Sequence, residues 1–403
     1  MLRTHGLNQR PIIYVIVASL ARMATGGSTV ALLLLAAAHQ VSGATLGGLA
    51  ACLTLPHLLG PILGRSLDSG KDVRPKLGIG FWFFGGCLMA TAMSFGRVPF
   101  ALSLAILIMA GASAPFLMGG ISSQVSRLFG DHPQVRKKAQ SWDVASYAVG
   151  TTLGPLLVAL SGEKVGAQSG LLLLGGLPLL ASLLLSALPD IRAEDKGHTD
   201  TNSIIDVVHA LVTHGPLCRT LYLTMGCAFA TAVLPLCAIF LVAEWGEHES
   251  SAALLSSIYG LGNILGAAWL IYRPLATRRA ERSLQFRAFG MVLGLVGVLF
   301  CLDMYTGLAA YLVLGVCNAL FFAASLAARS EYSPPAFASQ VFMWIAAMKI
   351  GAVSVGSYVA GMVIGSWGRL PLLLGAAVIL LLLVISLLQQ RRAAHASLES
   401  KIG

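Results

Sequence analysis

Long apolar runs separated by short polar loops make up this sequence from residue 12 to residue 389. A run of about 20 apolar residues is what an α-helix needs to cross the hydrocarbon core of a bilayer. Strands of a membrane barrel alternate in polarity at every second residue, so they would not give unbroken apolar runs of this length. With 56% hydrophobic and 11% charged residues, the chain is too apolar for a soluble fold. The sequence therefore predicts an all-α membrane protein.

Twelve such runs follow one another along the chain. We predict membrane helices at residues 12–38, 45–67, 77–95, 99–125, 140–161, 169–188, 219–243, 251–272, 284–303, 306–328, 338–364 and 370–389. The first run is too long for the core of a signal peptide, and no convincing cleavage site precedes the next run. We therefore interpret it as the first of 12 transmembrane helices.

The longest polar interval lies at the middle of the chain and separates two sets of six predicted helices. The predicted domains are an N-terminal six-helix bundle at 1–189, a cytoplasmic linker at 190–218, a C-terminal six-helix bundle at 219–389 and a cytoplasmic tail at 390–403. Inside the linker, Ser203 and Asp206 have the spacing of a capping box, which predicts a short helix through Val212 with one apolar face. That helix would lie either on the membrane surface or under the bundle.

Lysine and arginine gather in alternate loops. They are frequent at 3–10, 71–76, 127–138, 273–287 and 391–392, and sparse in the loops between. The positive-inside rule therefore puts both termini in the cytoplasm, and we expect a monomeric multi-pass protein of the cell inner membrane. The net charge of +10 follows this distribution, so no nucleic-acid partner is expected. The seven cysteines are scattered without a CxxC pair, which supports neither a metal site nor a disulfide framework.

A short charged loop joins the second and third predicted helices. It has a glycine one helical turn before an aspartate, then a second glycine and basic residues: Gly64, Asp68, Gly70, Lys71 and Arg74. This loop resembles the signature loop of the major facilitator superfamily, although Ser69 stands where a basic residue is usual and Asp72 interrupts the basic run. The resemblance implies two pseudo-symmetric six-helix bundles. It also implies a glycine at a helix contact, a capping aspartate and basic residues that hold a cytoplasmic gate.

A second motif lies in the fifth predicted helix. Gly150, Gly154 and Pro155 resemble the Gly-x-x-x-Gly-Pro element of proton-coupled exporters. Small residues four apart let helices approach closely, and proline permits a bend where the two halves would rock. Simple helix packing is the competing interpretation. The intramembrane arginine of the exporter motif in the fourth helix is missing from 107–111, which argues against drug-type proton antiport.

Two basic residues lie within predicted membrane helices. Arg22 shares a helix face with Thr25 and Thr29, and Lys349 lies near the middle of the eleventh helix. An ionisable side chain near the centre of a membrane helix costs about 2.5 to 3.5 kcal/mol on insertion scales, so it usually faces a cavity or a partner. We interpret Arg22, Thr25, Thr29 and Lys349 as substrate-binding candidates. A structural pairing of either cation is the alternative.

Other polar residues at membrane depth are fewer. Asp143 is predicted at the start of the fifth helix, on one face with Tyr147, and would either pair with Arg22 or cap its own helix. His57 follows Pro56 and would either titrate near neutral pH or bond to a carbonyl that the proline leaves unpaired. Asp143 and His57 are the proton-coupling candidates. Tyr147 and Asn263 are weaker substrate candidates, and interhelical hydrogen bonding is the alternative for Asn263.

The placement of the carboxylates indicates the kind of substrate. Every Asp and Glu is predicted in a loop or close to a helix end, whereas Arg22 and Lys349 lie at membrane depth. An unpaired buried cation is expensive, so the site favours a small anionic or zwitterionic organic solute over a cationic drug. The leading hypothesis is a secondary transporter that exports such a solute by proton-coupled alternating access. Proton-coupled uptake of an organic anion is the alternative.

An enzyme is disfavoured because the chain has no HExxH, Walker A or GxSxG motif. No cofactor is expected. The expected partners are the small-molecule substrate, protons and the lipid bilayer.

Overall fold

The computed structural model describes residues 5–65, 67, 72–129, 133–190, 209, 211–272, 280–334, 338–365 and 368–402. Within these ranges the regular structure is helical throughout. Eleven helical spans among the described residues are long and apolar enough to cross a membrane, and a shorter apolar stretch, Gly43–Leu59, stands between the first and second of them. The prediction of an all-α membrane protein with about twelve spans is therefore confirmed.

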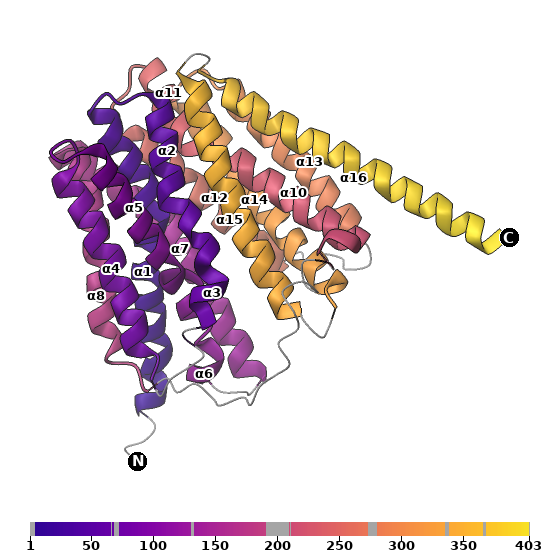
Figure 1. Cartoon of the computed structure of the whole chain (residues 1–403), viewed down its shortest axis with the longest axis horizontal. Coiled ribbons are helices and arrows are strands. Elements are labelled where there is room, and N and C mark those ends of the chain that lie inside the picture. Colours follow the sequence, from indigo (N-terminus) through magenta and orange to yellow (C-terminus); the bar gives the residue numbers. More distant parts are fainter. Residues whose placement is uncertain are drawn as a thin grey trace.

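The N-terminal half forms one side of the bundle (Figure 1). Its elements are α1 (His5–Ala38), α2 (Gly43–Thr54), the 3-10 turn η1 (Leu55–Leu59), α3 (Gly60–Arg65), α4 (Arg74–Ser94), α5 (Phe100–Pro115), the π-turn η2 (Phe116–Gly120), α6 (Val125–Phe129), α7 (Pro133–Val165) and α8 (Ala167–Leu185). Helix α1 packs against α7 and α8, and α4 packs against α5 and α8. Because α1 is central to this packing, its side chains meet those of several neighbours.

The C-terminal half forms the other side. Its elements are α10 (Gly215–Thr231), α11 (Leu234–Glu244), α12 (Ser251–Tyr272), α13 (Ala280–Leu299), α14 (Met304–Tyr332), α15 (Ala338–Ile364) and α16 (Leu370–Ile402). Helix α14 packs against α12 and α13, while α10 packs against α15 and α16. The last turns of α16 extend beyond the bundle (Figure 1).

Several predicted boundaries are wrong. The predicted second helix, 45–67, is broken into α2, η1 and α3, with Pro56 in the 3-10 turn. The predicted seventh helix is divided into α10 and α11 near Pro235. The fifth helix begins at Pro133 rather than 140, and the tenth continues to Tyr332 rather than 328. The capping box at Ser203 lies outside the described residues.

The two halves meet most closely through backbone. Helix α2 lies against α15, and a Cβ on Gly47 would stand 2.5 Å from the Ser357 carbonyl oxygen. Gly43 and Gly361 approach each other in the same way. Small residues allow this approach because a larger side chain would separate the helices. These contacts lie where α2 begins and α15 ends, which is the end of the bundle opposite the start of α1.

Helices α7 and α12 form the second contact between the halves. A Cβ on Gly260 would collide with the backbone of Thr151 and Thr152. Ser257 donates a hydrogen bond from Oγ to the Thr152 carbonyl oxygen at 2.8 Å. The halves are thus joined along both flanks of the bundle by glycines and hydroxyl side chains.

Candidate functional site

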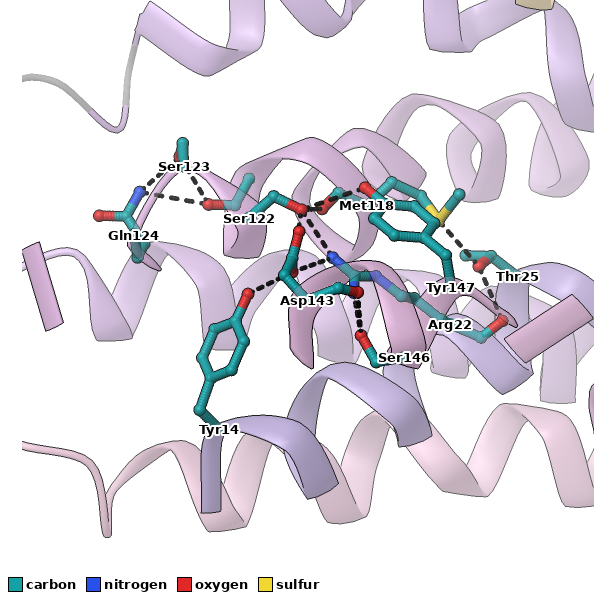
Figure 2. A network of polar contacts seen from close by, with 11 residues as sticks. Tyr14, Arg22, Thr25, Met118, Ser122, Ser123, Gln124, Asp143, Ser146 and Tyr147 are labelled. Atoms are coloured by element: carbon teal, nitrogen blue, oxygen red, sulfur yellow. Dashed lines mark hydrogen bonds and ion pairs between the residues drawn. The ribbon is translucent and has the colours of Figure 1, made fainter. Parts of the chain in front are cut away.

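Arg22 is the most deeply buried charged residue of the N-terminal half, with 1% of its surface exposed. It lies on α1 and reaches across to α7, where its Nη2 contacts Asp143 Oδ1 at 2.7 Å. Its Nη1 also donates to the Asp143 carbonyl oxygen at 2.6 Å. The guanidinium is therefore held by both the side chain and the backbone of one residue, as Figure 2 shows.

Further groups surround the Arg22 guanidinium. Nη2 donates to Ser122 Oγ at 2.6 Å, Nη1 donates to Ser146 Oγ, and the Tyr147 ring centroid lies 3.5 Å from the guanidinium carbon. Planar stacking on an aromatic ring suits arginine better than lysine. Only Nε among its nitrogens is recorded as buried without a partner. Arg22 is thus compensated by charge, hydrogen bonds and stacking.

Asp143 links this arginine to a tyrosine. Its Oδ1 accepts from Tyr14 Oη and, at 3.3 Å, from Ser122 Oγ (Figure 2). The sequence-based placement at the start of a helix is wrong, because α7 begins at Pro133 and Asp143 lies ten residues further on. It cannot cap its own helix from there. The ion pair with Arg22, one of two alternatives from the sequence, is the arrangement found, and its coupling role stays a prediction.

The two threonines beside Arg22 differ. Thr25 donates from Oγ1 to the Arg22 carbonyl oxygen at 3.1 Å and contacts Met118 Sδ at 3.2 Å. Thr29 makes no recorded side-chain hydrogen bond to a described residue and is half-buried. Their roles in substrate binding stay predictions.

Lys349 lies on α15 in the C-terminal half. Its Nζ stands 4.5 Å from the centroid of the Phe322 ring on α14, a cation–π contact. No ion pair or hydrogen bond joins it to a residue that the structure describes. Arg22 and Lys349 therefore have different neighbours and share no recorded partner.

Arg329 was missed by the sequence analysis because the tenth helix was predicted to end at residue 328. It lies on the last turn of α14, with 2% of its surface exposed. Its Nε and Nη2 are buried without a hydrogen-bond partner in the part of the chain that the structure describes. The signal was present in the sequence, since Phe322, Ser325 and Arg329 recur at helical spacing.

Two carboxylates of the C-terminal half are paired with arginines. Glu281 is paired with Arg219 and accepts from Gln390, and Glu244 is paired with Arg369 at 2.9 Å. Among the described residues, therefore, none of these acids is recorded against Lys349 or Arg329.

Asn263 and His57 are the two remaining candidates from the sequence. Asn318 donates from Nδ2 to Asn263 Oδ1 at 2.7 Å, and Asn263 donates to the Tyr259 carbonyl oxygen at 2.9 Å. The first bond joins α12 to α14 and fits the interhelical alternative for Asn263, whereas the second lies within α12. His57 lies in η1, and its Nδ1 is buried without a hydrogen-bond partner among the residues described.

A family model described as Major Facilitator Superfamily matches residues 14–312, which is most of the chain. The chain belongs to the Major Facilitator Superfamily. Solved structures of the same fold include a mutant of the nucleoside transporter NupG, with a TM-score of 0.77 and 14% identity over 94% of this chain and 99% of that one. No curated protein matches.

Two other solved structures are similar. A bacterial homologue of the human lysosomal transporter Spinster, in an inward-facing and unoccupied conformation, has a TM-score of 0.72 and 11% identity over 97% of this chain and 98% of that one. A mutant of the peptide transporter POT has a TM-score of 0.71 and 14% identity over 95% and 94%. At these identities the likeness concerns the fold. As a superfamily member the chain is a transporter of a small solute rather than an enzyme.

The signature loop of this superfamily member is described in part. Arg74 lies at the start of α4 and donates from Nε to the Asp72 carboxylate at 2.9 Å. Its Nη1 donates to the Leu188 carbonyl oxygen at 2.6 Å, and its Nη2 forms an ion pair with Asp190. It therefore ties the loop to the end of the N-terminal half. Gly64 lies within α3. Asp68, Gly70 and Lys71 lie outside the described residues.

The glycines of the second motif face α1. A Cβ on Gly150 would stand 2.6 Å from the Arg22 carbonyl oxygen, and one on Gly154 would meet the backbone of Met23 and Gly27. Their close contact is thus within the N-terminal half, as the packing interpretation expects. Pro155 lies inside a continuous α7. The gating role of all three stays a prediction.

Proposed function

We propose that this superfamily member is a secondary transporter of the cell inner membrane that exports a small anionic or zwitterionic organic solute. Export is driven by proton entry and proceeds by alternating access of the two halves. The arrangement of charge at membrane depth supports an anionic solute and proton coupling, and the contacts between the halves support alternating access.

Lys349 carries the argument for an anion. It is a cation within a membrane helix and has no carboxylate partner among the described residues. A charge at such a position is expensive unless a partner or a ligand compensates it. An acid group on the transported solute supplies that compensation, whereas a cationic solute would add to the repulsion.

The Arg22–Asp143 pair supports proton coupling. Asp143 is the acceptor for Arg22 and Tyr14, and 13% of its side chain is exposed. Protonation of this carboxylate would weaken its hold on Arg22 and free the guanidinium for another acceptor. The proton and the solute can then act on the same hydrogen-bond network, the proton at Asp143 and the solute at Arg22.

The contacts between the halves support alternating access. Gly43, Gly47 and Gly361 bring α2 and α15 together at the end opposite the start of α1. If the N-terminus is cytoplasmic, as the basic loops indicate, this is a state closed toward the outside. Arg74 lies at the other end, at the start of α4, where the gate of the alternate state would form.

Uptake of an organic anion together with a proton is the second candidate. The helix that corresponds to the exporter motif, α5, has no basic residue at 107–111. Protonated Lys349 would then bind the anion and carry the proton in the same direction.

Transport in proteoliposomes under an imposed pH gradient tests the proposal. Carboxylated and zwitterionic metabolites are screened while internal pH is recorded. Solute movement opposite to proton movement supports export by antiport. Joint movement of solute and proton instead supports uptake, and selective transport of neutral or cationic solutes contradicts the anion assignment.

A further inference from the structure

The Ser122 hydroxyl lies at the centre of the network around Arg22 and Asp143 (Figure 2). Its Oγ accepts from Arg22 Nη2 at 2.6 Å and lies 3.1 Å from Tyr147 Oη. Two acceptors lie within reach of its own hydrogen, Asp143 Oδ1 at 3.3 Å and the Met118 carbonyl oxygen at 3.1 Å. A hydroxyl group has one hydrogen and two lone pairs. The single hydrogen of Ser122 therefore serves either the carboxylate or the carbonyl, but not both.

The two acceptors respond differently to a proton. Ionised Asp143 is a charged acceptor, which forms a stronger hydrogen bond than the neutral Met118 carbonyl. A protonated carboxyl loses that charge and becomes a donor itself. The Met118 carbonyl oxygen, which is also the nearer of the two, is then the better acceptor for Ser122.

Few other ionisable groups face Asp143. Tyr14 and Arg22 from α1 and Tyr147 from α7 are the titratable or charged side chains recorded in this network among the described residues. Helix α6 places the Phe129 ring against Tyr14, and α8, which packs on α1 and α7, has no ionisable side chain in its sequence. Helix α12 contacts α7 about two turns further along. Within the described network Asp143 is thus the only carboxylate, and a proton taken up there acts first on these neighbours.

Met118 belongs to the π-turn η2, which follows Pro115 at the end of α5. Short π-helical turns are frequent at functional sites, and a serine bonded to the carbonyl group four residues before it often bends its helix. Thr25 of α1 contacts the other end of Met118, its Sδ, at 3.2 Å. The Ser122 hydrogen therefore reaches a segment that can change shape and that also contacts a substrate candidate on α1.

We propose that Ser122 is a positioning residue that passes the protonation of Asp143 to the π-turn η2. While Asp143 is ionised, Ser122 donates its hydrogen to the carboxylate. When Asp143 is protonated, Ser122 donates to the Met118 carbonyl oxygen and ties η2 to the turn that follows it. This inference rests on the proposed proton coupling at Asp143 and names the route by which the proton acts on a helix.

Hydrogen exchange of the η2 backbone amides in the purified, solute-free protein tests this route. After correction for the intrinsic effect of pH on exchange, these amides should exchange about twofold to tenfold more slowly in acid, in line with one added neutral hydrogen bond. Ser122→Ala should remove this pH dependence, and Ser122→Thr should keep it because the hydroxyl is retained. Ser123→Ala is the matched control and should also keep it. Ser123 donates to the Gly120 carbonyl oxygen of η2 at 2.8 Å, and no bond to Asp143 is recorded for it among the described residues.

Infrared titration of the Asp143 carboxyl provides a second measurement without solute. The band to follow is the protonated-carboxyl band that Asp143→Asn removes. Ser122→Ala should raise the pH at which this band is half-developed by about one unit, because the ionised carboxylate loses the stronger of the two bonds. Ser146→Ala should leave that pH unchanged, since Ser146 contacts Arg22 but donates to the Asp143 backbone carbonyl oxygen and not to the carboxylate.

Two results would overturn the role of Ser122. One is η2 exchange that does not change with the protonation of Asp143, or changes equally in Ser122→Ala. The other is an unmoved infrared midpoint in Ser122→Ala, which is what a merely structural serine would give. Because neither measurement involves a solute, failure of pH-driven transport in proteoliposomes would remove the proposed function separately, while pH-dependent exchange at η2 would still support the link from Asp143 through Ser122.

Discussion

The two halves of the molecule compensate buried positive charge differently. Arg22 in the N-terminal half is bonded to Asp143 and two serines and stacks on Tyr147. In the C-terminal half, Lys349 contacts only an aromatic ring, and two buried nitrogens of Arg329 have no hydrogen-bond partner among the described residues. One half is thus electrostatically complete without solute, and the other is not. Under the proposed function, this difference assigns the response to protons to the N-terminal half and the response to the solute to the C-terminal half.

Removal of each cation has the largest expected effect on this comparison. Arg22→Ala and Lys349→Met should both abolish transport. Arg22→Ala should also lower the free energy of unfolding by about 3 to 5 kcal/mol, because it leaves Asp143 buried without its partner. Lys349→Met should lower it far less, since it loses the cation–π contact with Phe322 but no hydrogen bond or ion pair among the described residues. Transport assays and denaturant unfolding measure the two effects.

Exposed Arg282 provides the control, and Arg282→Ala should alter neither quantity. Equal destabilisation by the Arg22 and Lys349 variants would remove the contrast between the halves.

Asp143→Asn should separate proton drive from solute movement. The amide keeps the shape of the carboxylate but cannot exchange a proton near neutral pH. Solute exchange across the membrane without a pH gradient should persist, while accumulation driven by a pH gradient should fall about tenfold or more, as expected when a group central to coupling is lost. Radiolabelled exchange and pH-driven transport are compared in the same vesicles. Proton-driven accumulation at the original level would exclude Asp143 as the coupling residue.

Two tyrosines, one in each half, test the same comparison between the halves with a smaller expected effect on stability. Tyr14 donates to the Asp143 carboxylate, and Tyr311 in the other half donates to the Leu234 carbonyl oxygen at 3.0 Å. Tyr14→Phe should cost about 1.5 to 3 kcal/mol because its acceptor is charged, and Tyr311→Phe about 0.5 to 1.5 kcal/mol because its acceptor is neutral. Denaturant unfolding measures both. The reverse order would show that Asp143 is not charged in the resting protein.

Two helix caps give the smallest expected effect. Asp303 Oδ1 accepts from the Thr306 backbone N–H at 2.8 Å, and this bond holds the pKa of Asp303 below its ordinary range. Its stabilising contribution is therefore present at neutral pH and is lost as pH falls through the lowered pKa. Asp303→Ala should lower the unfolding temperature at neutral pH and have less effect in acid.

Ser42 is the matched cap in the N-terminal half, where its Oγ accepts from the Thr45 backbone N–H at 3.3 Å. Serine does not titrate in this range, so the effect of Ser42→Ala should be independent of pH. A pH-independent effect of Asp303→Ala would contradict the role assigned to its carboxylate.

Most of the fold follows from the sequence because the length of each apolar run matches the thickness of the hydrocarbon core that a helix must cross. The breaks were harder to predict. Pro56 was visible, but proline inside a membrane helix is often accommodated without a break, and α7 contains Pro155 in that way. The early start of α7 was missed because the charged residues of 133–139 are typical of a loop between membrane helices. Charged residues are equally compatible with a helix that continues beyond the bilayer.

The site was predicted in part. Arg22 and Lys349 stand out because charges within apolar runs are rare. The bond between Arg22 and Asp143 was one of two possibilities, since a sequence alone does not give the relative rotation of two helices. Arg329 was missed because a basic residue at an expected helix end is ordinary in a membrane protein, and only the burial of its side chain distinguishes it.

The contact between α2 and α15 has a consequence for how the conformational balance is controlled. Helices α2 and α15 approach each other backbone to backbone at Gly43, Gly47 and Gly361. The populations of the two states should therefore depend on how closely these backbones can pack. A single methyl group at Gly361 should shift them strongly, since it would wedge the helices apart in one state and meet little resistance in the other.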